Sequence, residues 1–100
     1  MANRLEIEIR LLKKDAEDLR KQIDIIENSI DGTYTASAEL SRMWEGSAKV
    51  AFVNSLTQDQ EDMKELCKDL KKFLRCMEKA VKEYERAEQR VQEIVASIIV

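Results

Sequence analysis

Apolar and small residues recur along the first half of the chain in alternating steps of four and three residues, without a slip. This seam consists of Leu5, Ile9, Leu12, Ala16, Leu19, Ile23, Ile26, Ile30, Thr33, Ser37, Leu40 and Trp44. Such spacing is the heptad pattern of an α-helix that packs along one face against another helix. The chain has no proline and only two glycines, so little interrupts long helices. The pattern predicts a first helix over about residues 4–43.

The weak point of this first helix is Asp31-Gly32. Glycine in a helix interior costs about 1 kcal/mol relative to alanine, and the β-branched and small residues of TYTASA follow it. The heptad phase nevertheless continues through the segment. We therefore expect a single helix, straight or kinked at this point, rather than a break.

The second half repeats the pattern, which predicts a second helix over about residues 48–96. Its seam consists of Phe52, Leu56, Asp59, Met63, Leu66, Leu70, Phe73, Met77, Ala80, Tyr84, Ala87, Val91, Ile94 and Ile98. Between the helices, residues 44–47 form the expected turn, in which Gly46 can adopt the left-handed conformation that ends a helix and Ser47 can cap the next. Trp44 would fill the closed end. The prediction is one all-α domain over residues 1–100, an antiparallel helical hairpin.

A short turn would pair the two seams in order. Leu40 then faces Phe52, Ile30 faces Met63, Leu19 faces Phe73 and Ile9 faces Tyr84, and the residue numbers of each pair add up to 92 or 93. The sum is constant because both helices have the same heptad repeat. Its value depends on the length and geometry of the turn. Asp59 interrupts the second seam opposite Thr33 and Ser37. Either these hydroxyl groups offset the cost of burying its carboxylate, or the seam opens there and Asp59 meets water.

Additional apolar residues lie off both seams. Those expected to face a second hairpin are Val53, Cys67, Leu74, Val81, Ile7, Leu11 and Ile25. Apolar residues at three of every seven positions indicate burial against more than one neighbour. We therefore predict a dimer in which two hairpins form a four-helix bundle, with these residues as candidates for the interface.

The sequence shows no arrangement of residues typical of an active site, although it contains many carboxylates and two cysteines. The chain has no histidine, no glycine-rich phosphate loop and no pair of cysteines at metal-ligand spacing. Cys67 and Cys76 lie nine residues apart, on opposite sides of a helix, beyond the reach of a disulfide. We expect neither an enzyme nor a bound cofactor or metal.

The charge of the chain is unevenly distributed. A net charge of −3 argues against general nucleic-acid binding, although cations predominate between Lys64 and Lys82. This strip is interpreted as a solvated face in preference to a phosphate- or membrane-binding one. The N-terminal sequence alternates charged and aliphatic residues, so we expect no Sec-type signal peptide in it, and residues 94–100 are too few to span a bilayer.

The central Trp44-Glu45-Gly46 motif adds a resemblance to these patterns. A chain of 100 residues with two amphipathic helices and this turn resembles the WXG family of small helical proteins, the early-secreted-antigen type. The resemblance covers the whole length. Tyr84 and Glu88 also match the Tyr-x-x-x-Asp/Glu pattern that some members carry late in the second helix as part of an export signal. In those members a flexible tail usually follows, whereas helical periodicity here continues to Ile98.

The resemblance implies a protein exported folded by the type VII secretion system of Gram-positive bacteria or mycobacteria. It would be made in the cytoplasm without a cleavable signal peptide and then secreted or displayed at the cell surface. Its expected partners are another copy or a second WXG-type protein, the secretion ATPase, and a larger secreted toxin in some systems. Neither nucleic-acid binding nor stable membrane insertion is expected. The alternative is a cytosolic helical adaptor or chaperone that is not secreted.

Overall fold

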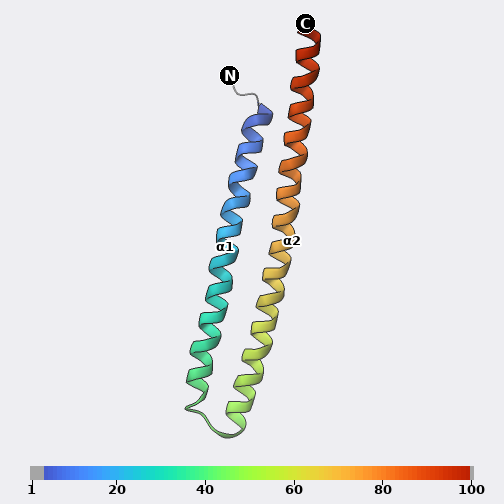
Figure 1. Ribbon diagram of the computed structural model, residues 1–100. Coiled ribbons are helices and arrows are strands. Elements are labelled where there is room, and N and C mark those ends of the chain that lie inside the picture. Colours follow the sequence, from blue (N-terminus) through green and yellow to red (C-terminus); the bar gives the residue numbers. More distant parts are fainter. Residues whose placement is uncertain (1–3, 100) are drawn as a thin grey trace. The chain divides into compact units, whose positions relative to one another are not determined.

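The computed structural model describes residues 4–99, which form two α-helices. Helix α1 spans Arg4–Ser41 and helix α2 spans Gly46–Ile99. The two helices run antiparallel in the hairpin of Figure 1, which confirms the predicted all-α helical hairpin. No helix within residues 4–99 is long and apolar enough to cross a membrane.

The hairpin divides into two compact units. One, here called the terminal unit, combines residues 1–20 with residues 72–100, and the other, the turn unit, comprises residues 21–71. Each unit contains a segment of both helices.

Helix α1 continues through Gly32 without a break, as the uninterrupted heptad phase predicted. The Thr35 hydroxyl group donates a hydrogen bond to the Asp31 carbonyl oxygen at 3.0 Å, which keeps a β-branched residue compatible with the helix. A Cβ atom at Gly32 would meet no other atom within 4 Å. The glycine is therefore not required by close packing.

The connection between the helices comprises residues 42–45. Three hydrogen bonds tighten the end of α1: Arg42 N–H donates to Glu39 O at 3.2 Å, Met43 N–H to Leu40 O at 3.1 Å and Trp44 N–H to Ser41 O at 3.1 Å. These bonds satisfy the last carbonyl groups of α1, so the helix ends without a left-handed glycine. Gly46 does have a positive φ of 77°, as expected, but it begins α2 instead of ending α1.

Ion pairs define how the two helices are aligned in each unit. In the terminal unit Lys13 bonds Glu85 at 3.0 Å and Arg20 bonds Glu78 at 2.8 Å, and in the turn unit Lys71 bonds Glu27 at 3.0 Å. The residue numbers of each pair add up to 98, not to the predicted 92 or 93. The predicted register is therefore wrong by about five residues, although the connection has the four residues expected for the turn.

The shifted register changes which face of α2 is buried. Leu74 and Val81 are buried in the terminal unit and Cys67 in the turn unit, whereas Phe73 is 61% exposed and Tyr84 50% exposed. The predicted pairing of Phe73 and Tyr84 with α1 is thus wrong. Cys67, Leu74 and Val81, expected on the outer stripe, instead belong to the core of the single chain. Helix α1 buries Ile9, Ala16 and Ile23, all members of its predicted seam.

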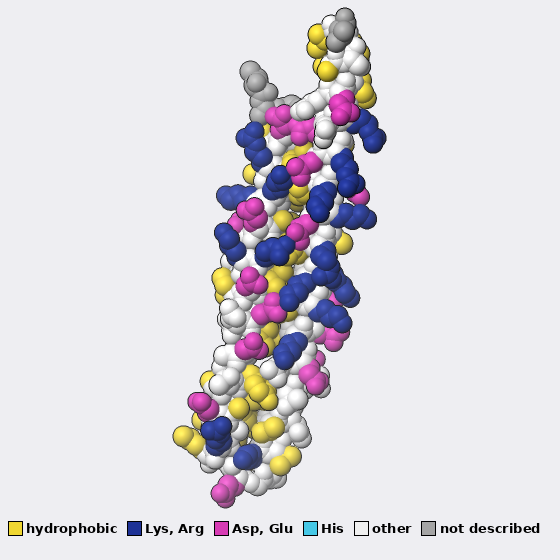
Figure 2. Space-filling view, in the orientation of Figure 1, with side chains coloured by type: hydrophobic (Ala, Val, Ile, Leu, Met, Phe, Trp, Pro, Cys, Tyr) yellow, Lys and Arg dark blue, Asp and Glu magenta, His cyan; other side chains and the backbone are white. Residues whose placement is uncertain are grey.

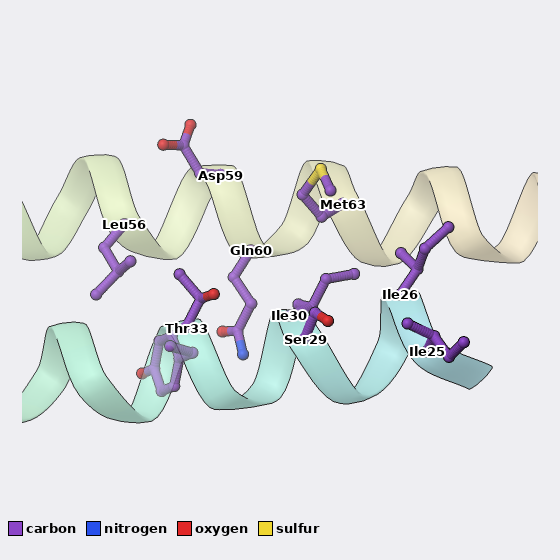
Figure 3. Close-up of a pocket in the computed structure, with 10 residues that line it drawn as sticks. Ile25, Ile26, Ser29, Ile30, Thr33, Leu56, Asp59, Gln60 and Met63 are labelled. Atoms are coloured by element: carbon purple, nitrogen blue, oxygen red, sulfur yellow. The ribbon is translucent and has the colours of Figure 1, made fainter. Parts of the chain in front are cut away.

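Asp59 is exposed, and its carboxylate points away from α1 (Figure 3). Of the two alternatives for this residue, the structure therefore shows the solvated one. The neighbouring Gln60 is half-buried and extends towards α1 in its place. A neutral amide at this position avoids the cost of burying a carboxylate.

Candidate recognition sites

The Trp-Glu-Gly turn holds its indole ring against α2. The Trp44 and Phe52 ring centroids lie 4.7 Å apart with the ring planes inclined by 56°, a favourable tilted arrangement. Trp44 remains 39% exposed, and Glu45 beside it is exposed. One side of the indole thus stabilises the end of the hairpin, while the remainder is accessible to a partner.

An open apolar groove lies between the helices of the turn unit (Figure 3). Its volume is about 390 Å³, and its lining residues are Ile25, Ile26, Ser29, Ile30, Thr33, Tyr34, Leu56, Asp59, Gln60 and Met63. Ser29 and Thr33 are small residues that leave this space unfilled. Because the Asp59 carboxylate points away from α1, the groove offers mainly aliphatic surface, which suits an apolar side chain from another helix.

Glu88 occupies an apolar position in the terminal unit. It follows Cys67, Leu74 and Val81 at intervals of seven residues, and its side chain is half-buried. Its Oε1 atom is buried and has no hydrogen-bond partner among the described residues. The sequence contained a signal for this environment, since the heptad that carries the buried apolar residues of α2 continues to a glutamate.

The carboxyl groups of Glu88 and Glu6 interact across the two helices. Burial raises the pKa of Glu88 above its ordinary value of 4.5, and the hydrogen bond to Glu6 and the charge of Glu6 raise it further. The charge of Arg10 acts in the opposite direction and that of Glu85 adds to the increase. Two carboxyl groups share a hydrogen bond only when one of them holds a proton. This pair therefore favours the protonated form of Glu88.

The two halves of the predicted export motif have different environments. Tyr84 is half-exposed, whereas the Glu88 side chain is directed to its interaction with Glu6. Helix α2 continues past the motif to Ile99, as the periodicity of the sequence predicted. The tyrosine ring is thus accessible to a partner, and the glutamate is accessible only in part.

The predicted interface residues fall into two groups. Ile7, Leu11, Ile25 and Val53 are exposed, whereas Cys67, Leu74 and Val81 are buried in the single chain. Large exposed side chains that the prediction did not assign to the interface occur on α2; they include Met63, Leu66, Phe73 and Tyr84. Cys67 and Cys76 are both free thiols. Within residues 4–99, no group of three histidine, cysteine, aspartate or glutamate side chains could hold a metal ion.

These features define a class of protein: a small all-α hairpin with a tryptophan and a glycine at the turn midway along the chain. The family model described as WXG100, proteins of 100 residues with WXG, matches residues 4–89, and the chain belongs to this family. Members are non-catalytic helical proteins, and this protein is accordingly not an enzyme. The comparisons with curated proteins and with solved structures found no match.

Proposed function

We propose that this protein is a small dimeric helical protein that is exported by type VII secretion, or that acts as a co-secreted partner in that system. The observation that carries the proposal is the Trp44-Glu45-Gly46 turn, which presents a partly exposed indole in a chain that belongs to the WXG100 family over residues 4–89. Membership of this family is consistent with a substrate of type VII secretion. The protein would be made in the cytoplasm and then secreted or displayed at the cell surface.

The exposed apolar side chains of α2 support dimerisation. Met63 and Leu66 in the turn unit are 41% and 48% exposed, and Phe73 in the terminal unit is 61% exposed. Leu66 and Phe73 are seven residues apart and therefore share a helical face, which is not the face that contains Leu74. Burying a large apolar side chain completely contributes about 1.5–3 kcal/mol. A second hairpin packed on this surface would complete a four-helix bundle, with Ile7, Leu11, Ile25 and Val53 as further exposed candidates for the interface.

The mass of the protein in solution tests this dimer. Light scattering at tens of micromolar is expected to give the mass of two chains. A well-folded monomer at that concentration would mean that the exposed apolar surface has another role. In a separate experiment, co-purification from the native cells would show whether the second chain of the dimer is another copy or a different WXG-type protein.

The proposed recognition residues are Trp44, Glu45 and Gly46 at the turn and Tyr84 and Glu88 late in α2. By resemblance to the family, these residues would be recognised by the secretion ATPase, and a larger secreted toxin could be exported together with the dimer. Trp44→Phe keeps an aromatic ring against Phe52 but removes the indole N–H group. The variant is expected to fold normally and to be exported poorly.

A matched control for this experiment is Tyr34→Phe, which changes another partly exposed aromatic residue in the turn unit. Its export is expected to equal that of the wild type. Circular dichroism establishes that both variants are folded. If Trp44→Phe is exported at the wild-type level, the role of the indole is limited to packing on Phe52.

The groove of the turn unit favours one alternative. An open apolar surface of this kind can also hold a client helix, as in a cytosolic adaptor or chaperone that is not itself secreted. The two functions differ in location. Intact protein that stays within the cells, in a complex with another polypeptide, would support the adaptor and not the exported protein.

A further inference from the structure

One flank of α2 in the terminal unit carries only basic and no acidic side chains between residues 72 and 90. This basic stripe consists of Lys72, Arg75, Lys79, Lys82, Arg86 and Arg90. The steps between its members are of three or four residues, so at 100° per residue all six fall within a sector of about 80°. The stripe extends over about 27 Å at 1.5 Å per residue. All six residues are exposed, and Figure 2 shows dark blue side chains along α2.

The acidic residues of the same segment lie outside this sector, and several interact with α1. Glu78 bonds Arg20, Glu85 bonds Lys13, and Glu88 interacts with Glu6. No member of the basic stripe forms an ion pair with any residue from 4 to 99. Like charges three or four residues apart repel one another on a helix. The row of positive charge thus forms no ion pair within residues 4–99, and the nearest acidic residue of the same segment of α2, Glu83, lies about 20° outside the sector.

We propose that the basic stripe binds the surface of an anionic phospholipid bilayer. A row of charges parallel to the helix axis can contact a flat surface along its whole length, so all six cations reach lipid phosphate and carboxylate groups together. Each lysine or arginine near an anionic membrane surface contributes separately to binding. The attachment is peripheral, since the sector contains no apolar side chain that could enter the bilayer.

The composition of the sector also distinguishes a bilayer from other anionic partners. A partner helix would require apolar residues at the centre of the interface, where lysine is depleted, and the sector contains none. Single-stranded nucleic acid is usually held by aromatic side chains that stack on its bases, and the sector has none of these either. The uniform row of cations suits a surface that presents phosphate groups but no base sequence to be recognised.

The proposed lipid contact is separate from the proposed dimer. Phe73 and Tyr84 lie well outside the sector of the basic stripe, about 130° and 150° respectively from its mean direction at 100° per residue. A hairpin whose apolar face is covered by a second chain would still expose its basic stripe. The inference therefore goes beyond the proposed function and stands without it.

Vesicle sedimentation with the full-length protein tests the inference. The protein is expected to bind vesicles that contain phosphatidylserine and not vesicles of phosphatidylcholine alone. Raising the salt concentration from about 50 mM to about 500 mM should release it, because the Debye length falls several-fold over this range. Each cation contributes about fivefold to binding, so the triple variant Arg75→Gln, Lys79→Gln, Arg86→Gln should bind about 100-fold more weakly.

The matched control replaces three exposed cations that lie outside the stripe, by Lys14→Gln, Lys21→Gln and Arg42→Gln. It carries the same change in net charge and is expected to retain most of the binding. An equal loss in both variants would show that net charge alone matters and would overturn the inference. So would equal binding to the two kinds of vesicle, or duplex DNA that displaces the protein from anionic vesicles at equal phosphate concentration.

Discussion

Phe73 and Leu74 are adjacent in the sequence, and the structure gives them opposite roles. Leu74 is 5% exposed and belongs to the core of the terminal unit, whereas Phe73 is 61% exposed. Replacing each by alanine in turn therefore separates the packing within one chain from the proposed packing between chains. The register predicted from the seams would instead place Phe73 in the core, so that Phe73→Ala would destabilise the single chain more than Leu74→Ala.

The expected magnitudes follow from the burial of each side chain. Leu74→Ala removes a buried side chain and should cost about 2–5 kcal/mol, a large part of the roughly 5–15 kcal/mol that stabilises a small domain. Phe73 buries about two-fifths of its surface in the single chain. Since full burial of phenylalanine contributes about 1.5–3 kcal/mol, Phe73→Ala should cost the single chain only about 1 kcal/mol.

The same substitution should have a larger effect on the dimer. The exposed three-fifths of each Phe73 side chain would be covered in both chains, so the variant should lose about 2–4 kcal/mol of association free energy. That loss corresponds to a dissociation constant raised by about two orders of magnitude. Leu74→Ala should destabilise the fold at every protein concentration.

Urea unfolding followed by circular dichroism, at a series of chain concentrations, measures the first quantity, and sedimentation equilibrium measures the second. Both variants should remain helical without urea. The reasoning is refuted if Phe73→Ala destabilises the dilute chain more than Leu74→Ala does, because Phe73 would then be the core residue. Unchanged association of Phe73→Ala would exclude this face as the dimer interface.

Two further predictions concern the ends of the hairpin and its glycines. Because burial and the interaction with Glu6 raise the pKa of Glu88, the folded state binds a proton more tightly than the unfolded chain. Its contribution to stability is thus most favourable at low pH and is lost as the pH rises from about 4.5 through the raised pKa. The protection factors of amide groups in α1 near Glu6, which correct exchange rates for their intrinsic dependence on pH, should fall over this range in the wild type and in the exposed control Glu83→Gln, but much less in Glu88→Gln. Thermal unfolding should show that Gly32→Ala stabilises the protein by about 0.5–1 kcal/mol, since its surroundings are open, whereas Gly46→Ala destabilises it by about 1–2 kcal/mol because φ is 77°. Destabilisation by Gly32→Ala, stabilisation by Gly46→Ala, or the same pH response in both glutamate variants would contradict these predictions.

The buried face of α1 could be predicted from the sequence because its apolar positions leave few choices. Ile9, Ala16 and Ile23 repeat every seven residues, and all three are buried as predicted. Continuity through Gly32 was predictable for the same reason, since the phase of the pattern does not change there. The position of Trp44 at the closed end of the hairpin could be predicted from the sequence. Its contact with Phe52 could not, because that contact depends on the geometry of the turn.

The buried face of α2 could not be derived from the apolar pattern, because that pattern covers too wide an arc. Phe73 and Leu74 both fit a heptad, and the larger side chain was assigned to the core although the smaller one occupies it. The interhelical ion pairs Lys13–Glu85 and Arg20–Glu78 form in the observed register. The predicted register would also have placed opposite charges together, such as Lys14 with Glu78 and Asp24 with Lys68, so matching charges across the two sequences does not distinguish the two registers.

The dependence of export on the secretion ATPase tests the central claim most directly. The measurement is the amount of intact protein in the culture medium of the native cells, with the ATPase active or inactivated by substitution, relative to a cytosolic marker of lysis. The proposed function predicts that the protein accumulates in the medium only when the ATPase is active and is retained in the cells when it is not. Equal amounts in the medium of both strains, or protein confined to the cells in both, would contradict it.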